Sequence, residues 1–258
     1  MIIKKYFFRL FLSVIILVFF SSSVFAENSL KIIAASDLRY AMNEIINEFK
    51  LKNKNTKIDV IYASSGNAFS QISSNAPYDI FFSADIKYTE QLKEKGLAIT
   101  KPKLYGIGQI VLWSKKIDIS KKDMFFLNTD EIKKIAIANP KHAPYGKKAI
   151  ESLKYYKLFD KIEKKLIYGE NISQSTQFVD TGNAEICITA FSLLSSANMK
   201  NKGYFFVIPE KSYSPLKQGY ILLKNAQDNK LAKSFYDFID SIEVKNILKK
   251  YGFKVDFK

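Results

Sequence analysis

The chain has 258 residues and a formal net charge of +15, and its single cysteine excludes an internal disulfide framework. A basic chain can bind nucleic acid, but Arg9 and Arg39 are the only arginines here, and arginine is the residue that contacts bases and phosphates in a bidentate manner. The lysines are scattered over predicted helix faces, which indicates a solvated surface and argues against a nucleic-acid partner.

Residues 1–26 have the pattern of a secretory signal peptide. Three basic residues precede an apolar run at 11–20, and the segment ends in Val24-Phe25-Ala26, close to a small-x-small cleavage site. An N-terminal membrane anchor is the alternative, but the apolar run is short for a membrane span. We therefore expect cleavage after Ala26 and a protein that is exported to the periplasm.

Strands and helices alternate through the rest of the chain. Apolar runs predict strands at 31–35, 57–63, 78–83, 109–113, 134–138, 165–168, 185–190, 204–207 and 220–223. Helical spacing of apolar residues predicts helices between most of these strands and two more at the C-terminal end. Continuous apolar strands that alternate with helices predict an α/β fold with mostly parallel sheets flanked by helices.

Four predicted strand–helix turns, at 34–37, 63–66, 143–146 and 170–173, place hydroxyls or unpaired backbone N–H groups at a helix start. Ligands of open α/β sheets bind at the carboxyl ends of strands, and helix N-termini favour anions. For any single turn, simple N-capping by serine is the more common role. Four similar turns together favour an anion site without a fixed counter-charge.

Several motifs carry a resemblance to a known family. They are Ala34-Ala35-Ser36, Ser64-Ser65-Gly66, APYDIFFSAD at 76–85, GQIVLWS at 108–114, IAIANP at 135–140, APYG at 143–146 and GNAE at 182–185. Over essentially the whole mature chain, the sequence resembles the periplasmic molybdate-binding proteins of ABC importers. The resemblance implies a two-lobed type II periplasmic-binding fold with the ligand cleft between the lobes. Lobe I is then expected at 27–107 plus 215–258, and lobe II at 108–214.

The resemblance also implies the binding residues. Ser36 stands where the family has a serine or threonine after the first strand, and Ser65 is the second serine of the Ser-Ser turn. Tyr145 lies between proline and glycine in the APYG turn, and Ile172 is placed to offer a backbone N–H. These groups would contact the oxygens of molybdate, without direct coordination of the metal and without a cofactor. The late-strand tyrosine of some members is replaced here by Ala190.

Asp37 departs from the family pattern, in which this position is asparagine or apolar. In one interpretation, Asp37 points away from the ligand and offers only its backbone N–H. In the other, its carboxylate faces the ligand and accepts a hydrogen bond from a protonated oxyanion such as hydrogen phosphate. Molybdate and tungstate are unprotonated at neutral pH and cannot donate that bond, so the sequence leaves both interpretations open.

The predicted function is periplasmic binding of molybdate, with tungstate as a second candidate ligand, and delivery to an inner-membrane ABC permease by a monomer. Alternatives are a receptor for sulfate or phosphate, or a secreted hydrolase of phosphate or sulfate esters. An enzyme is disfavoured because His142 is the only histidine and no Ser–His or Cys–His pair stands out. The sequence also shows no cluster with metal-ligand spacing.

Overall fold

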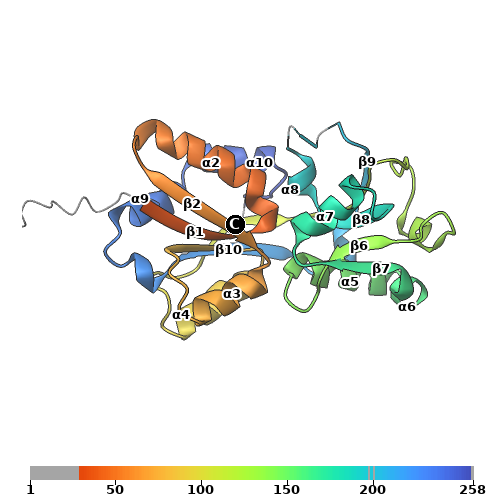
Figure 1. Ribbon diagram of the computed structural model, residues 1–258, viewed down its shortest axis with the longest axis horizontal. Coiled ribbons are helices and arrows are strands. Elements are labelled where there is room, and N and C mark those ends of the chain that lie inside the picture. Colours follow the sequence, from red (N-terminus) through yellow and green to blue (C-terminus); the bar gives the residue numbers. More distant parts are fainter. Residues whose placement is uncertain (1–28, 197, 200, 257–258) are drawn as a thin grey trace, which may run out of the picture.

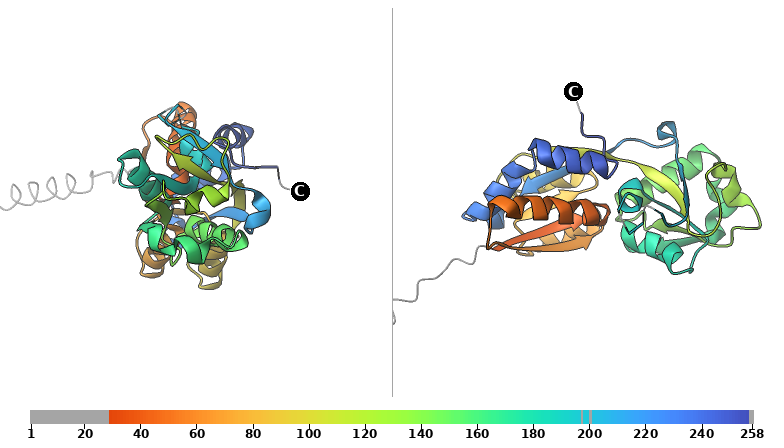
Figure 2. Two further views of the ribbon diagram at one scale, coloured as in Figure 1. Left: turned by 90° about the vertical axis from the view of Figure 1, so that its right-hand side faces the viewer. Right: turned by 90° about the horizontal axis from the view of Figure 1, so that it is seen from above.

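The computed structural model describes residues 29–196, 198–199 and 201–256. The predicted signal peptide and its cleavage site lie outside these residues. None of the helices in the described ranges is long and apolar enough to cross a membrane. Figure 1 shows two α/β lobes side by side, and the view from above in Figure 2 shows extended segments that pass between them.

The sheet of lobe I has five strands in the order β2-β1-β3-β10-β4. Their bounds are Ser29–Ala35 (β1), Lys57–Ala63 (β2), Ile80–Ser83 (β3), Lys103–Gly108 (β4) and Leu216–Leu222 (β10). Strand β1 runs parallel to β2 and β3, whereas β10 runs antiparallel to β3 and β4.

The sheet of lobe II has the order β7-β6-β8-β5-β9. Its strands are Ile110–Ser114 (β5), Ile135–Ala138 (β6), Leu166–Gly169 (β7), Ile186–Ala190 (β8) and Tyr204–Val207 (β9). Strand β6 is parallel to β7 and β8, and β5 is antiparallel to β8 and β9. The chain crosses between the sheets at Gln109 and again between β9 and β10, next to the lobe boundaries expected from the resemblance.

Both sheets are mixed: in each of them four strands run in one direction and one strand, β10 or β5, runs in the other, so the expectation of mostly parallel sheets holds for the strand directions. The parallel strands run toward the cleft between the lobes. Strands β5 and β10 each follow a crossing from the other lobe, so they enter their sheets at the cleft and must run in the opposite direction.

Helices cover both faces of each sheet. In lobe I, one face carries α2 (Arg39–Lys52), α9 (Lys230–Phe238) and α10 (Ile242–Lys250), and the other carries α3 (Ser65–Ser73) and α4 (Ile86–Glu94). In lobe II, α5 (Pro144–Tyr155) and α6 (Phe159–Ile162) cover one face, and α7 (Ile172–Asp180) and α8 (Phe191–Leu194) the other. Short 3-10 helices lie at Ser36–Leu38 (η1), Met124–Asn128 (η2), Glu163–Lys165 (η3), Glu210–Ser212 (η4) and Lys224–Ala226 (η5).

Successive side chains of β1 point to opposite faces of the sheet and pack against the two different helix layers. Ile32 packs with α2, α9 and α10, while the next residue, Ile33, packs with α3 and α4. Both are fully buried, because a strand covered on both faces sends successive side chains into two different cores. Cys187, predicted to be a buried thiol, is fully buried in β8.

Candidate functional site

All five predicted site residues line one cavity between the lobes: Ser36, Asp37, Ser65, Tyr145 and Ile172. Ser36 follows β1, and Ser65 comes shortly after β2 in lobe I. The other two turns follow β6 and β7 in lobe II. The structure brings these distant segments together because the parallel strands of each sheet end at the edge that faces the cleft.

The two serine hydroxyls are arranged as donors. The Oγ of Ser65 accepts a hydrogen bond from the backbone N–H of Ala84 at 2.9 Å. The Oγ of Ser36 accepts a longer one from the N–H of Ser173, at 3.4 Å. Neither hydroxyl donates a hydrogen bond to another group among the described residues. Because a hydroxyl carries one proton and two lone pairs, both protons can be donated to an anion in the cavity.

Three helix N-termini meet at the same cavity. Ser65 and Ile172 are the first residues of α3 and α7, and Tyr145 is the second residue of α5, after Pro144. N–H groups in the first turn have no acceptor within their own helix, and the helix dipole makes this end partly positive. No lysine or arginine lines the cavity in the described part of the chain, so its donors are neutral groups.

Asp37 ends a chain of buried hydrogen bonds. The hydroxyl of Tyr105 donates to Oε1 of Gln218, and Nε2 of Gln218 donates to the Tyr145 hydroxyl at 2.9 Å. The Tyr145 hydroxyl donates in turn to Oδ2 of Asp37 at 3.0 Å. We call these four residues the buried chain. Its direction commits the Tyr145 proton to Asp37, so the donor that Tyr145 can offer an anion in this arrangement is its backbone N–H.

The carboxyl of Asp37 does not reach solvent, because the residue is only 1% exposed. Burial raises its pKa from 3.8 to about 6, although the nearby Gln218 amide and the hydrogen bond from Tyr145 lower it. Its second oxygen, Oδ1, has no hydrogen-bond partner among the described residues. The pKa values of Tyr105 and Tyr145 are raised well above the ordinary range, first by burial and then by the nearby Asp37 carboxylate.

A second set of interlobe contacts lies at the rim of the cleft. Ser64 Oγ lies 2.8 Å from Nδ1 of His142, and the N–H of Gly66 donates to the His142 carbonyl at 2.8 Å. Nε2 of His142 is 3.7 Å from Oε1 of Glu170, which also accepts a hydrogen bond from the Asn67 amide. We call these five residues the rim cluster.

No Ser–His pair stood out in the sequence, and the structure brings one together, Ser64 with His142. Ser64 and His142 are 78 residues apart and meet only because the two lobes touch. Asp85 caps α4, because its carboxylate accepts a hydrogen bond from the N–H of Lys87 in the first turn.

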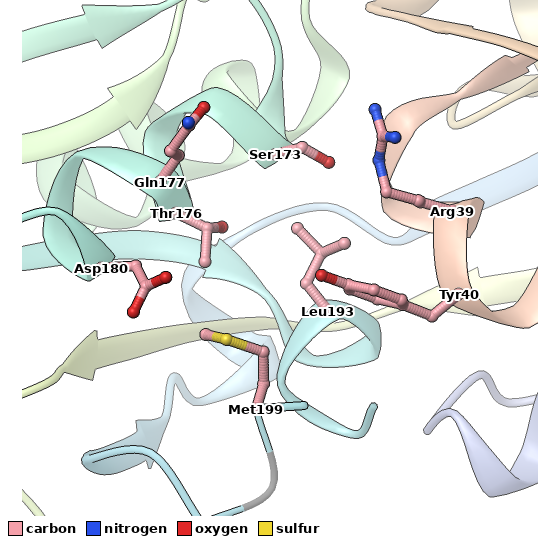
Figure 3. A pocket seen from close by; sticks show the side chains of 8 residues that line it. All are labelled: Arg39, Tyr40, Ser173, Thr176, Gln177, Asp180, Leu193 and Met199. Atoms are coloured by element: carbon pink, nitrogen blue, oxygen red, sulfur yellow. The ribbon is translucent and has the colours of Figure 1, made fainter. Parts of the chain in front are cut away.

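A larger interlobe cavity of about 330 Å³ lies between α2 and α7. Figure 3 shows the carboxylate of Asp180 and the guanidinium of Arg39 on opposite sides of it. Both charges are engaged elsewhere: Asp180 pairs with Lys115 at 2.8 Å, and Arg39 lies 4.5 Å from the ring centroid of Tyr62. The two charged groups of this cavity are therefore directed to partners outside it.

Two sheet-and-helix lobes, joined by crossing segments and enclosing a cavity of neutral donors, define a two-lobed solute-binding protein. The chain belongs to the family of bacterial extracellular solute-binding proteins, whose family model matches residues 30–254.

Similar proteins refine this assignment. The chain is 35% identical to the molybdate-binding protein ModA of Rhodobacter capsulatus over 74% of this chain and 75% of that one. It is 30% identical to ModA of Azotobacter vinelandii over 86% of this chain and 88% of that one. The solved structure of the A. vinelandii periplasmic molybdate-binding protein superimposes with a TM-score of 0.83 at 27% identity, covering 88% of this chain and all of that chain. The two-lobed fold predicted from the sequence is thereby confirmed.

Proposed function

We propose that this protein is a periplasmic receptor that binds molybdate, with tungstate as a second candidate, and delivers it to an ABC-type permease in the inner membrane. The observation that carries the proposal is the convergence of two serine hydroxyls and three helix N-termini on one cavity without a lysine or arginine. The ModA relatives support molybdate as the ligand. In this proposal the protein acts as a monomer, is not an enzyme, needs no cofactor and loses its signal peptide after Ala26.

Donors without counter-charges suit a fully deprotonated oxyanion. Each oxygen of tetrahedral molybdate accepts hydrogen bonds, and neutral donors in a water-excluded site stabilise the charge without a fixed cation. The cavity has a free volume of only about 10 Å³, about enough for one water. An anion therefore enters when the lobes move apart, and closure brings the donors of both lobes onto it. Selection against the smaller sulfate would follow from the size of the closed cavity.

Substitution of Ser65 tests the site. Ser65→Ala removes a hydroxyl donor to a charged ligand, and we expect molybdate affinity to fall by about 10- to 150-fold, since such a bond contributes about 1.5–3 kcal/mol. Isothermal titration calorimetry with molybdate, tungstate, sulfate and phosphate would measure the affinities. Ser70→Ala is the matched control, because Ser70 lies on the same helix and donates to the Gly66 carbonyl at 3.0 Å, outside the cavity.

Two results would overturn parts of this proposal. Equal molybdate affinity in wild type and Ser65→Ala would show that the anion binds elsewhere. Binding of sulfate or phosphate with no response to molybdate or tungstate would retain a receptor but replace its ligand.

A further inference from the structure

The cavity contains one group that does not suit a dianion. Ser36, Ser65 and the three helix N-termini offer protons, but Asp37, an acidic residue, belongs to the same lining. Its Oδ2 already accepts the Tyr145 proton at 3.0 Å, while its Oδ1 is buried and has no hydrogen-bond partner among the described residues. An ionised carboxylate would repel the anion and would leave this oxygen unsatisfied in the closed cavity.

The groups packed around Asp37 supply no charge to offset its own. Tyr145 faces it from α5 and Gln218 from β10, with Tyr105 of β4 behind Gln218. Both tyrosines stay neutral at physiological pH, because their pKa values are raised well above the ordinary range by burial. From α8, Ser192 donates its hydroxyl to the main-chain carbonyl of Asp37 at 2.9 Å, not to the carboxyl.

The other charged groups near this region point elsewhere. The guanidinium of Arg39, two residues along the chain, lies over the ring of Tyr62. His142 and Glu170 belong to the rim cluster and contact Ser64 and Asn67. Asp37 is thus a buried acid with neutral neighbours. When a ligand binds, the charge of this carboxyl can change only by gain or loss of its own proton.

We propose that Asp37 binds the dianion in its protonated form, so that the receptor takes up one proton from solvent with each molybdate. The inference rests on the proposed function and adds the protonation state of its site. The proton sits on Oδ1, since Oδ2 is held as an acceptor by Tyr145. The carboxylic acid then donates from Oδ1 to an anion oxygen, which converts the one repulsive group of the cavity into another donor.

The buried chain keeps this proton within reach at neutral pH. Burial raises the pKa of Asp37 to about 6 in the described arrangement, so a dianion beside it has less far to raise the pKa than it would for an ordinary aspartate. The same geometry separates two kinds of ligand. Molybdate brings no proton, so the proton must come from solvent, whereas hydrogen phosphate could donate its own proton to ionised Asp37 without net uptake.

Calorimetry in paired buffers tests the inference directly. Molybdate is titrated into the exported protein from pH 6 to pH 8, each time in two phosphate-free buffers with different ionisation enthalpies, which gives the number of protons taken up. We expect uptake to approach one proton per molybdate at pH 8 and the dissociation constant to rise by about 50-fold between pH 6 and pH 8, for a carboxyl that titrates near 6 in the free protein.

Two variants assign the proton. Asp37→Asn keeps a neutral group of the same shape that can donate, so it should bind molybdate with no proton uptake and with an affinity that is flat over the same pH range. His142→Gln removes the one histidine of the sequence, and it should retain the uptake seen in wild type. Thermal unfolding of each variant without ligand checks that it is folded.

The outcomes separate this inference from the proposed function. Molybdate binding without proton uptake in wild type, or with equal uptake in Asp37→Asn, contradicts the inference alone. Loss of the uptake in His142→Gln would move the proton to the rim cluster and would equally overturn it. Tight phosphate binding that is lost in Asp37→Asn would show that Asp37 accepts from a protonated ligand instead. A protein that binds no molybdate at any pH contradicts the proposed function and this inference together.

Discussion

The buried chain and the rim cluster both connect the two lobes, but they do so in different surroundings. The buried chain links Asp37 to Tyr145, which are 1% and 2% exposed. In the rim cluster, the side chains of His142 and Glu170 are 20% and 60% exposed. Water can replace or screen the polar contacts of the rim, whereas it does not reach those of the buried chain.

This difference decides which contact can make the lobes sensitive to protonation. In the buried chain each donor is committed in one direction, from Tyr105 through Gln218 and Tyr145 to Asp37, so a change of charge at its end has no solvent to offset it. At the rim, the long contact between His142 and Glu170 is of the solvated kind, which contributes little to stability. The rim cluster joins the lobes instead through the backbones of Gly66 and His142, which approach closely enough to form a hydrogen bond.

The largest expected effect is on the pH dependence of stability when the buried acid is removed. The folded pKa of Asp37 is about 6 against 3.8 for an ordinary aspartate, so the folded state binds this proton more tightly than the unfolded state does. The contribution of Asp37 is therefore most favourable below pH 4 and is lost as the pH rises through 6, by about 3 kcal/mol. Asp37→Asn should lack this loss.

Urea unfolding of wild type and Asp37→Asn between pH 4 and pH 7.5 would measure it. The difference in unfolding free energy between the two proteins isolates Asp37 from carboxyls of the opposite kind, such as Glu210, whose pKa is lowered by hydrogen bonds from Lys254 and Gln109. We expect the unfolding free energy of Asp37→Asn to increase relative to that of wild type as the pH rises. A difference that stays constant over this range would show that Asp37 is not desolvated as described.

Local patterns in the sequence were enough to predict the four turns, because strand–turn–helix signals are local and the ends of parallel strands meet at one edge. The resemblance, not these patterns, singled out Ser36, Ser65 and Ile172 as binding residues. Helix α3 begins at Ser65, within the turn at 63–66 where the sequence predicted a helix start. The resemblance identified Tyr145, but nothing local indicated that its hydroxyl donates to Asp37.

The interlobe contacts were not predictable in the same way. Tyr145 and Asp37 are 108 residues apart, and Gln218 interrupts the apolar pattern of β10, so that strand was expected to begin at Tyr220 rather than at Leu216. Strand β4 was not among the strands predicted from apolar runs, because its sequence, KLYGIG, contains two glycines and no continuous apolar run. The positions of these residues depend on how distant segments pack together. A hydrophobic pattern with the period of a strand or a helix carries no information about such packing.

A smaller effect is expected where the backbones of the two lobes meet at the rim. A Cβ on Gly66 would lie 2.7 Å from the carbonyl oxygen and 2.9 Å from the Cα of His142 in the other lobe. The φ of Gly66 is not in the left-handed region, so alanine suits its backbone and the obstacle is contact with lobe II alone. Overpacking of this kind costs about 1–3 kcal/mol, and here that cost falls on lobe closure.

Gly66→Ala should therefore weaken molybdate binding by about 5- to 150-fold while the urea midpoint of the free protein changes little. Calorimetry gives the affinity, and Ser70→Ala again serves as the control on the same helix. Unchanged affinity would mean that the lobes need not approach this closely around the anion. A large loss of stability in the free protein would instead place the clash within the resting fold.

The smallest effect is expected from the side chain of His142 itself. His142→Gln keeps a neutral group that can hydrogen-bond Ser64, and the neighbouring carboxylate of Glu170 is 60% exposed, so solvent can satisfy it when the imidazole is removed. The backbone hydrogen bond from Gly66 to the carbonyl of residue 142 is untouched by the substitution. Molybdate affinity measured by calorimetry at pH 7.5 should then change by less than about fivefold, in keeping with the value of a solvated contact. A larger loss of affinity would show that the imidazole of His142, and not only the backbone beside it, holds the lobes closed. Solvent exposure would then not explain the difference between the buried chain and the rim cluster.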